Sequence, residues 1–147
     1  MICNDDVSTI NNKKAEDRLL VDYYEKTFSA ESEIGYEEIV LYEHDDQKVK
    51  MSIYHNGGTA NEKKEEYLVM IEAYQKALDI CKKYNLKQKD NAAEGMDGKY
   101  CVIKFREKRN DETVYRISSD EIVENRMNVF NEMSKILRSY SNKDNKI

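Results

Sequence analysis

The sequence predicts an α+β fold, in which an antiparallel sheet of about five to six strands carries two helices packed on one face. Residues 36–55 and 100–118 alternate apolar and polar side chains around a central polar turn, which is the pattern of half-buried antiparallel strands. Each segment is later followed by apolar residues at helical spacing. The 147 residues fit one domain, which we expect at residues 16–141 between flexible tails at 1–15 and 142–147.

Residues 18–28 fit either a helix or a strand. On a helix, Leu20 and Tyr24 would lie on one side. On a strand, Val21 and Tyr23 would share one face. The segment holds two adjacent tyrosines, a valine and a threonine, which favour β structure, and a predicted strand follows it closely. We therefore predict a strand here.

Residues Tyr36–His44 and Lys48–His55 form the clearest predicted element, a β-hairpin. His44-Asp45-Asp46-Gln47 supplies the polar residues of its turn. A slip of one residue in register would expose every apolar side chain of the hairpin, so the alternation predicts which face packs against the helices. That face carries Ile39, Leu41, Val49, Met51 and Ile53.

Two interpretations compete for residues 59–86. Thr59-Ala60-Asn61-Glu62 fits a capping box, which would start a helix that runs to Leu86. However, residues 60–66 contain only Ala60 as an apolar residue, so the first turns of that helix would bury almost nothing. We favour a loop to Glu65, a strand at Glu66–Ile71 covered on both faces, and an amphipathic helix at Glu72–Tyr84.

The second half of the chain resembles the first in outline. Strands are predicted at Tyr100–Phe105 and Thr113–Ser118, and Ser118-Ser119-Asp120-Glu121 fits a capping box before the last helix. Apolar positions of the first hairpin recur 64 residues later, as in Ile39 and Ile103, which suggests a ββα pseudo-repeat. The stripe of the last helix comprises Met127, Phe130, Met133, Ile136, Leu137 and Tyr140.

The net charge of −5 is unevenly distributed along the chain. Residues 1–46 contain 13 acidic and 4 basic residues, whereas residues 47–147 contain 16 acidic and 20 basic residues. An acidic front end disfavours nucleic acid and suits a partner protein with a basic surface. No segment approaches the roughly 20 apolar residues of a membrane span, so we expect no membrane association and a cytoplasmic location.

The sequence contains no recognisable catalytic, cofactor or metal motif. GxSxG, HExxH and P-loop patterns are absent, and His44 and His55 lie too far apart along the hairpin to share a metal ion. His55 could instead form an ion pair with Glu37. Cys3, Cys81 and Cys101 form no CxxC pair, and we expect buried free thiols at positions 81 and 101. We predict neither a cofactor nor a metal ion.

These features favour a non-enzymatic protein-interaction module of the inhibitor, immunity or adaptor type. Eleven tyrosines and no tryptophan are present, and tyrosine is enriched at protein interfaces. The sheet face without helices should carry Tyr42, Tyr54, Lys48, Lys50, Lys104 and Arg106. The candidate binding residues are Tyr42, Tyr54, Glu37, Glu43 and Asp46. The alternative is a small-molecule or anion site near Gly57-Gly58, where backbone N–H groups could form an anion nest; an enzyme without a readable motif ranks third.

Overall fold

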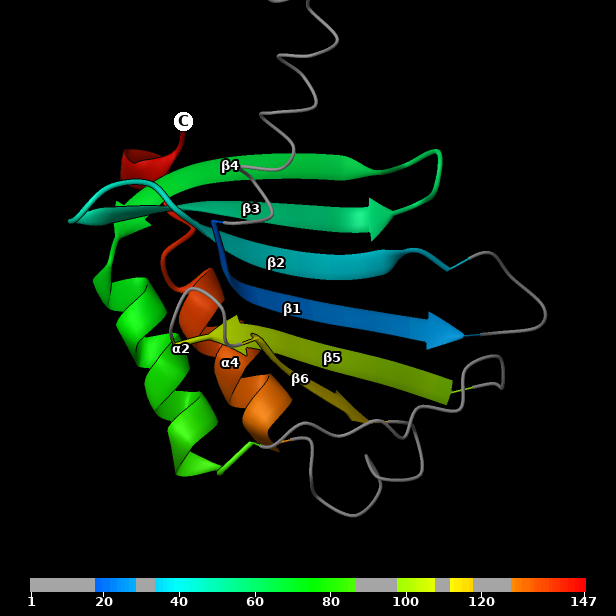
Figure 1. Ribbon diagram of the computed structural model, residues 1–147. Helices are drawn as coiled ribbons and strands as arrows, with labels where there is room; N and C mark the ends of the chain where they lie inside the picture. The colour runs from blue at the N-terminus through cyan, green and yellow to red at the C-terminus, as the bar shows by residue number, and fades with distance from the viewer. Residues whose placement is uncertain (1–17, 29–33, 87–97, 108–111, 118–127) are drawn as a thin grey trace, which may run out of the picture.

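The computed structural model describes residues 18–28, 34–86, 98–107, 112–117 and 128–147 (Figure 1). Its antiparallel strands form one six-stranded sheet in the order β4-β3-β2-β1-β5-β6. The predicted α+β fold, with a sheet of five to six strands and two helices, is confirmed. The strands are β1 (Leu19–Phe28), β2 (Tyr36–Glu43), β3 (Lys48–Gly57), β4 (Lys63–Met70), β5 (Gly98–Arg106) and β6 (Glu112–Ile117).

Strand β1 lies at the centre of the sheet, and the prediction of a strand at residues 18–28 is confirmed. It pairs with β2 on one side and with β5 on the other. Val21 and Tyr23 are completely buried in the core. The strand thus buries the side chains that the alternating pattern placed on one face. The register shifts between Leu19 and Val21. Leu20 therefore departs from the expected alternation and packs against the core.

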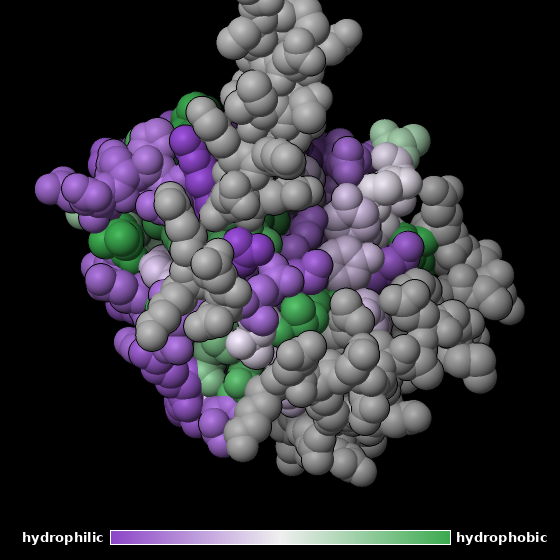
Figure 2. All heavy atoms as spheres, in the orientation of Figure 1, coloured by the Kyte–Doolittle hydropathy of each residue, from purple (hydrophilic) through white to green (hydrophobic). Residues whose placement is uncertain are grey.

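Helices α2 (Glu72–Lys83) and α4 (Asn128–Arg138) lie side by side on one face of the sheet (Figure 1). Phe130 of α4 packs against Tyr23 of β1, with 6.3 Å between the ring centroids. The outward side of α2 is hydrophilic (Figure 2). All five hairpin residues predicted to face the helices are buried, which confirms the predicted register: Ile39, Leu41, Val49, Met51 and Ile53.

Strand β4 begins at Lys63, so the predicted loop to Glu65 is wrong for its last residues. Backbone pairing with β3 starts at Lys63 opposite His55, and hydrogen bonding does not depend on whether the side chains are apolar. Thr59, the first residue of the apparent capping box, accepts a hydrogen bond from the backbone N–H of Asn61 at 3.2 Å. That contact belongs to a turn, and the helix begins at residue 72, as the favoured interpretation predicted. The predicted cover on both faces of the preceding strand is wrong, because β4 is an edge strand and Met70 is 52% exposed.

In the second half, β5 and β6 pair antiparallel as predicted, and α4 follows them. The capping box at residues 118–121 lies outside the described residues, as do Cys3 and Met127. The pseudo-repeat remains a prediction: β4 lies between the hairpin and the helix of the first half, and the corresponding residues 118–127 of the second half lie outside the described part of the chain. Cys81 and Cys101 are buried free thiols, as expected.

Residues 142–147, predicted as a flexible tail, lie against β4. A short 3-10 helix, η2 (Lys143–Asn145), leads into an antiparallel bridge between Lys146 and Tyr67. The backbone N–H of Ile147 then donates to the carbonyl oxygen of Glu66 at 3.0 Å. None of the helices in the described part of the chain has the length and apolar character needed to cross a bilayer.

Candidate functional site

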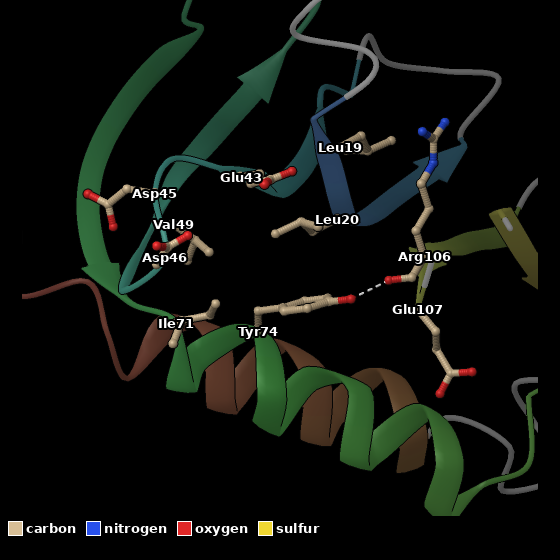
Figure 3. A pocket seen from close by; sticks show the side chains of 10 residues that line it. All are labelled: Leu19, Leu20, Glu43, Asp45, Asp46, Val49, Ile71, Tyr74, Arg106 and Glu107. Carbon is tan, nitrogen blue, oxygen red and sulfur yellow. Dashed lines mark hydrogen bonds between the residues drawn. The ribbon is translucent and has the colours of Figure 1, made fainter. Parts of the chain in front are cut away.

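A cleft of about 410 Å³ opens at one end of the sheet, between the β2–β3 turn and the start of α2 (Figure 3). We call it the end cleft. The start of β1 and the end of β5 complete its walls. Its lining residues are Leu19, Leu20, Glu43, Asp45, Asp46, Val49, Ile71, Tyr74, Arg106 and Glu107.

The inside of the end cleft is apolar, and hydrogen bonds fix the elements that surround it. Leu20, Ile71 and Tyr74 point into it (Figure 3), and the bulge in β1 gives Leu20 that direction. The Tyr74 hydroxyl donates to the backbone carbonyl oxygen of Arg106, which joins α2 to β5. The N–H of Ile71 donates to the carbonyl oxygen of Gln47 at 2.8 Å. The start of α2 is therefore fixed against the hairpin turn.

The rim of the end cleft is acidic. Four lining residues carry a carboxylate, namely Glu43, Asp45, Asp46 and Glu107. The one basic lining residue, Arg106, directs its guanidinium away from the cleft (Figure 3). Asp45 accepts hydrogen bonds from two N–H groups of its own turn, each at 2.8 Å, and these bonds lower the pKa of its carboxyl. Glu107 pairs with Lys82 of α2 at 3.0 Å. Within the described part of the chain, Glu43 and Asp46 form no ion pair.

A second cavity, of about 370 Å³, lies on the face of the sheet that carries no helix. We call it the face pocket. It meets the end cleft at Leu19 and Arg106, which line both cavities. Its remaining lining residues are Asp22, Glu38, Val40, Tyr42, Tyr54, Lys104 and Glu112.

Two carboxyl groups from adjacent strands meet in the face pocket. The β1–β2 register pairs Asp22 with Val40 and Tyr24 with Glu38, so Asp22 and Glu38 are diagonal neighbours on one face. Burial, followed by the hydrogen bond to Asp22, raises the pKa of Glu38 to about 8. Burial also raises the pKa of Asp22, against the lowering effects of the Glu38 hydrogen bond and of Lys104. The pair therefore holds one proton near neutral pH.

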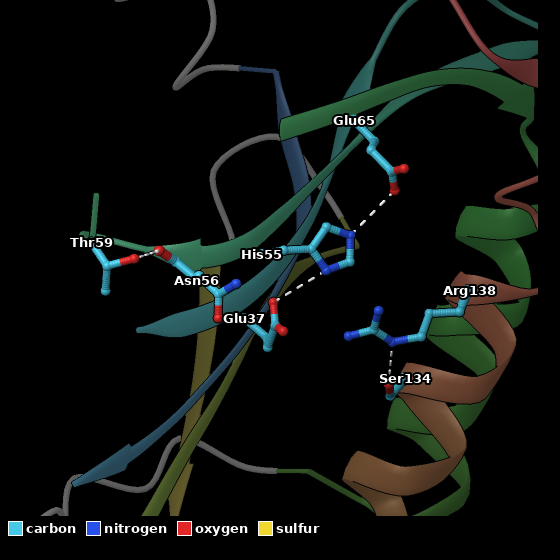
Figure 4. A network of polar contacts seen from close by, with 7 residues as sticks. All are labelled: Glu37, His55, Asn56, Thr59, Glu65, Ser134 and Arg138. Carbon is cyan, nitrogen blue, oxygen red and sulfur yellow. Dashed lines mark hydrogen bonds and ion pairs between the residues drawn. The ribbon is translucent and has the colours of Figure 1, made fainter. Parts of the chain in front are cut away.

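On the helix-covered side of the sheet, His55 lies between two carboxylates (Figure 4). Its Nδ1 atom is 3.4 Å from Glu37, as the sequence suggested, and its Nε2 atom is 3.2 Å from Glu65. This contact with His55 lowers the pKa of the Glu65 carboxyl. The cluster joins three neighbouring strands, β2, β3 and β4. It lines neither cavity, so its contacts favour a role in holding the strands together.

Gly57 and Gly58 have local structural roles. A Cβ atom added to Gly57 would lie 2.2 Å from the Tyr36 ring, so that ring needs a glycine beneath it. Gly58 has a φ of 80°, which side-chain-bearing residues rarely adopt. Its N–H donates to the Glu62 carboxylate at 3.2 Å. An anion could bind this N–H only by displacing the Glu62 carboxylate.

The structure divides the predicted binding residues among four places. Glu43 and Asp46 line the end cleft, Tyr42 and Tyr54 line the face pocket, Glu37 contacts His55, and Gly57-Gly58 lies in the β3–β4 connection. The sequence also indicated Lys104 and Arg106 for the helix-free face, and both line the face pocket.

The sequence reasoning missed Asp22 and Glu38 as a pair. Alternation placed each on a face of its strand, but only the register of β1 against β2 brings the two carboxyl groups together. No group of three or more metal-ligating side chains occurs among the described residues. The chain matches no protein-family model, no curated protein and no solved structure. Its function must therefore be inferred from these two cavities.

Proposed function

We propose that this protein is a non-enzymatic protein-binding module that captures a basic, partly apolar segment of its partner in the end cleft. The observation that carries the proposal is the combination of an apolar interior with an acidic rim. A lysine or arginine beside a leucine or phenylalanine complements that combination, because long basic side chains pack their stems on apolar surface and keep the charge at the edge.

Charge supports this choice of partner. Four residues that line the end cleft carry a carboxylate, and three of them belong to the acid-rich first 46 residues of the chain. Such a field attracts a basic segment from a distance and raises the association rate more than the final affinity. Dissociation depends on the apolar contacts with Leu20, Ile71 and Tyr74.

A direct test uses two synthetic peptides of ten residues, one alternating lysine with leucine and phenylalanine and the other with glutamate at each lysine position. We expect only the basic peptide to bind, with an association rate that falls as the salt concentration rises from about 0.05 to 0.5 M. Backbone amide NMR shifts should appear at residues that line the end cleft. Binding of both peptides alike, or shifts confined to other surfaces, would contradict the proposal.

Matched variants sharpen the test. Glu43→Gln with Asp46→Asn removes the two rim carboxylates that have no other ion-pair partner in the described part of the chain, and we expect association to slow by about tenfold. Asp45 is left unchanged because it holds the turn. Asp79→Asn, on the exposed side of α2, removes the same kind of charge elsewhere and should leave association unchanged.

A further inference from the structure

We propose that the face pocket binds an organic cation of the alkylguanidinium or alkylammonium type, which takes the place of the proton shared by Asp22 and Glu38. The site meets the end cleft at Leu19 and Arg106 but needs none of its rim carboxylates. The chemistry would suit either a basic side chain of a partner protein or a free small cation.

Asp22 carries an unsatisfied oxygen atom. Its Oδ1 atom is buried and accepts no hydrogen bond from any described N–H or O–H donor. While both carboxyl groups are ionised, this oxygen lacks a donor, and a buried carboxylate without one is costly. A proton on Glu38, a water molecule or a ligand can supply that donor. The pocket is therefore poised to accept a hydrogen-bond donor at this point.

The charges of the face pocket balance while the carboxyl pair holds one proton. With Glu38 protonated, the pocket contains two carboxylates, those of Asp22 and Glu112, and two cations, Lys104 and Arg106. Arg106 pairs with Glu112 at 3.2 Å. Loss of the Glu38 proton leaves one negative charge in excess. A bound monovalent cation restores neutrality, so proton and cation can be exchanged without a net change in buried charge.

Other ligand classes fit less well. An anion would meet the buried Asp22 carboxylate and add a second uncompensated charge. Calcium and magnesium ions take at least six oxygen ligands, and zinc takes four ligands, mostly cysteine and histidine, whereas the pocket offers one close carboxyl pair beside two cations. A guanidinium or ammonium group has only donors. It can satisfy Asp22 and Glu38 together while its alkyl stem lies along Val40 and Tyr42.

The groups that surround the pair set how binding depends on pH. Around Asp22 of β1 they are Glu38 and Tyr42 of β2, Tyr54 of β3, Lys104 and Arg106 of β5, and Glu112 of β6. Burial raises the pKa of Tyr42, so its hydroxyl stays neutral. Lys104 favours the ionised form of both carboxyl groups. It also repels an incoming cation, and its removal should therefore strengthen binding.

The experiment uses N-acetyl-arginine N-methylamide as the probe and the matching citrulline derivative as its neutral isostere. We expect NMR shifts at Asp22 and Glu38 with the arginine probe alone, and an affinity that rises about tenfold per pH unit between pH 6 and 8. Calorimetry in two buffers of different ionisation enthalpy should detect release of close to one proton per ligand at pH 7. Methylguanidine tests whether the natural ligand is a free small cation or a basic side chain of a partner protein. An affinity equal to that of the arginine probe indicates a free small cation, and a weaker affinity indicates a peptide-borne side chain.

Two variants protect the test against misfolding. Glu38→Gln keeps the shape of the side chain but cannot exchange a proton, so binding should weaken and lose its pH dependence. Lys104→Met should bind the probe several-fold more tightly, a gain that an unfolded protein cannot produce. Equal binding of the citrulline derivative, pH-independent binding, or no shift at 50 mM probe (roughly the weakest affinity that a built site should show) would overturn the proposal.

Discussion

The buried carboxyl pair should make the stability of the fold fall as the pH rises. The folded state raises the pKa of Glu38 from 4.5 to about 8, so between these values the folded protein binds more protons than the unfolded chain. The free energy of unfolding therefore decreases with pH in this interval. The stabilisation is fully present below pH 4.5 and is lost as the pH rises through 8.

The size of the effect follows from the shift. At about 1.36 kcal/mol per pKa unit, a move from 4.5 to about 8 corresponds to at most about 5 kcal/mol. The Glu38 side chain is partly exposed, and water screens its charge, so we expect about half of that, roughly 2–3 kcal/mol. This loss is large for a domain of this size, whose total stability is of the order of 5–15 kcal/mol.

The measurement is urea unfolding at intervals from pH 5 to pH 9 for the wild type and Glu38→Gln. The glutamine amide can donate to Asp22 as the protonated carboxyl does, but it cannot ionise. We expect the two proteins to match near pH 5 and the variant to be more stable at pH 9 by about 2–3 kcal/mol. Glu112→Gln, in the same pocket, should keep the pH dependence of the wild type. An unchanged pH dependence in Glu38→Gln would refute the reasoning.

Three further predictions concern the core, the β3–β4 connection and the thiols. Ile53→Ala should cost about 2–5 kcal/mol in urea unfolding, because the side chain is 1% exposed; a cost below about 0.5 kcal/mol is typical of surface sites and would contradict its place in the core. Gly57→Ala should destabilise the fold through its clash with the Tyr36 ring, and the loss should shrink when Tyr36 is also replaced by alanine. Burial raises the pKa of Cys81 to about 12, so in a Cys3→Ser background this thiol should resist a disulfide reagent until the protein unfolds; modification of the native protein at the rate of a free thiol would rule this out.

The sequence was informative where one residue pattern had one physical solution. The alternation around residues 44–47 could bury its apolar side chains in only one register, and the structure confirms that register. The start of β4 was harder to predict, because Lys63 and Lys64 join the sheet through backbone hydrogen bonds that side-chain polarity does not reveal. Alternation also failed locally at Leu20, since a register shift beside it turns that side chain into the end cleft.

The candidate sites were less predictable than the fold, because both depend on contacts between distant segments. The rim carboxylates at Glu43 and Asp46 could be identified from charge, but the apolar interior beneath them needs Leu20 from β1 and Tyr74 from α2. The carboxyl pair in the face pocket depends on which strands are neighbours and in what register. Abundant acidic residues hide such a pair in the sequence, since any two of them could be the ones that meet.

The attachment of the C-terminal residues to β4 has a consequence for the behaviour of the protein in concentrated solution. An outermost strand with free backbone N–H and C=O groups is a template for pairing with another molecule. The contacts of Lys146 and Ile147 with Tyr67 and Glu66 occupy part of that edge. Removal of residues 141–147 should therefore promote concentration-dependent self-association, visible by light scattering.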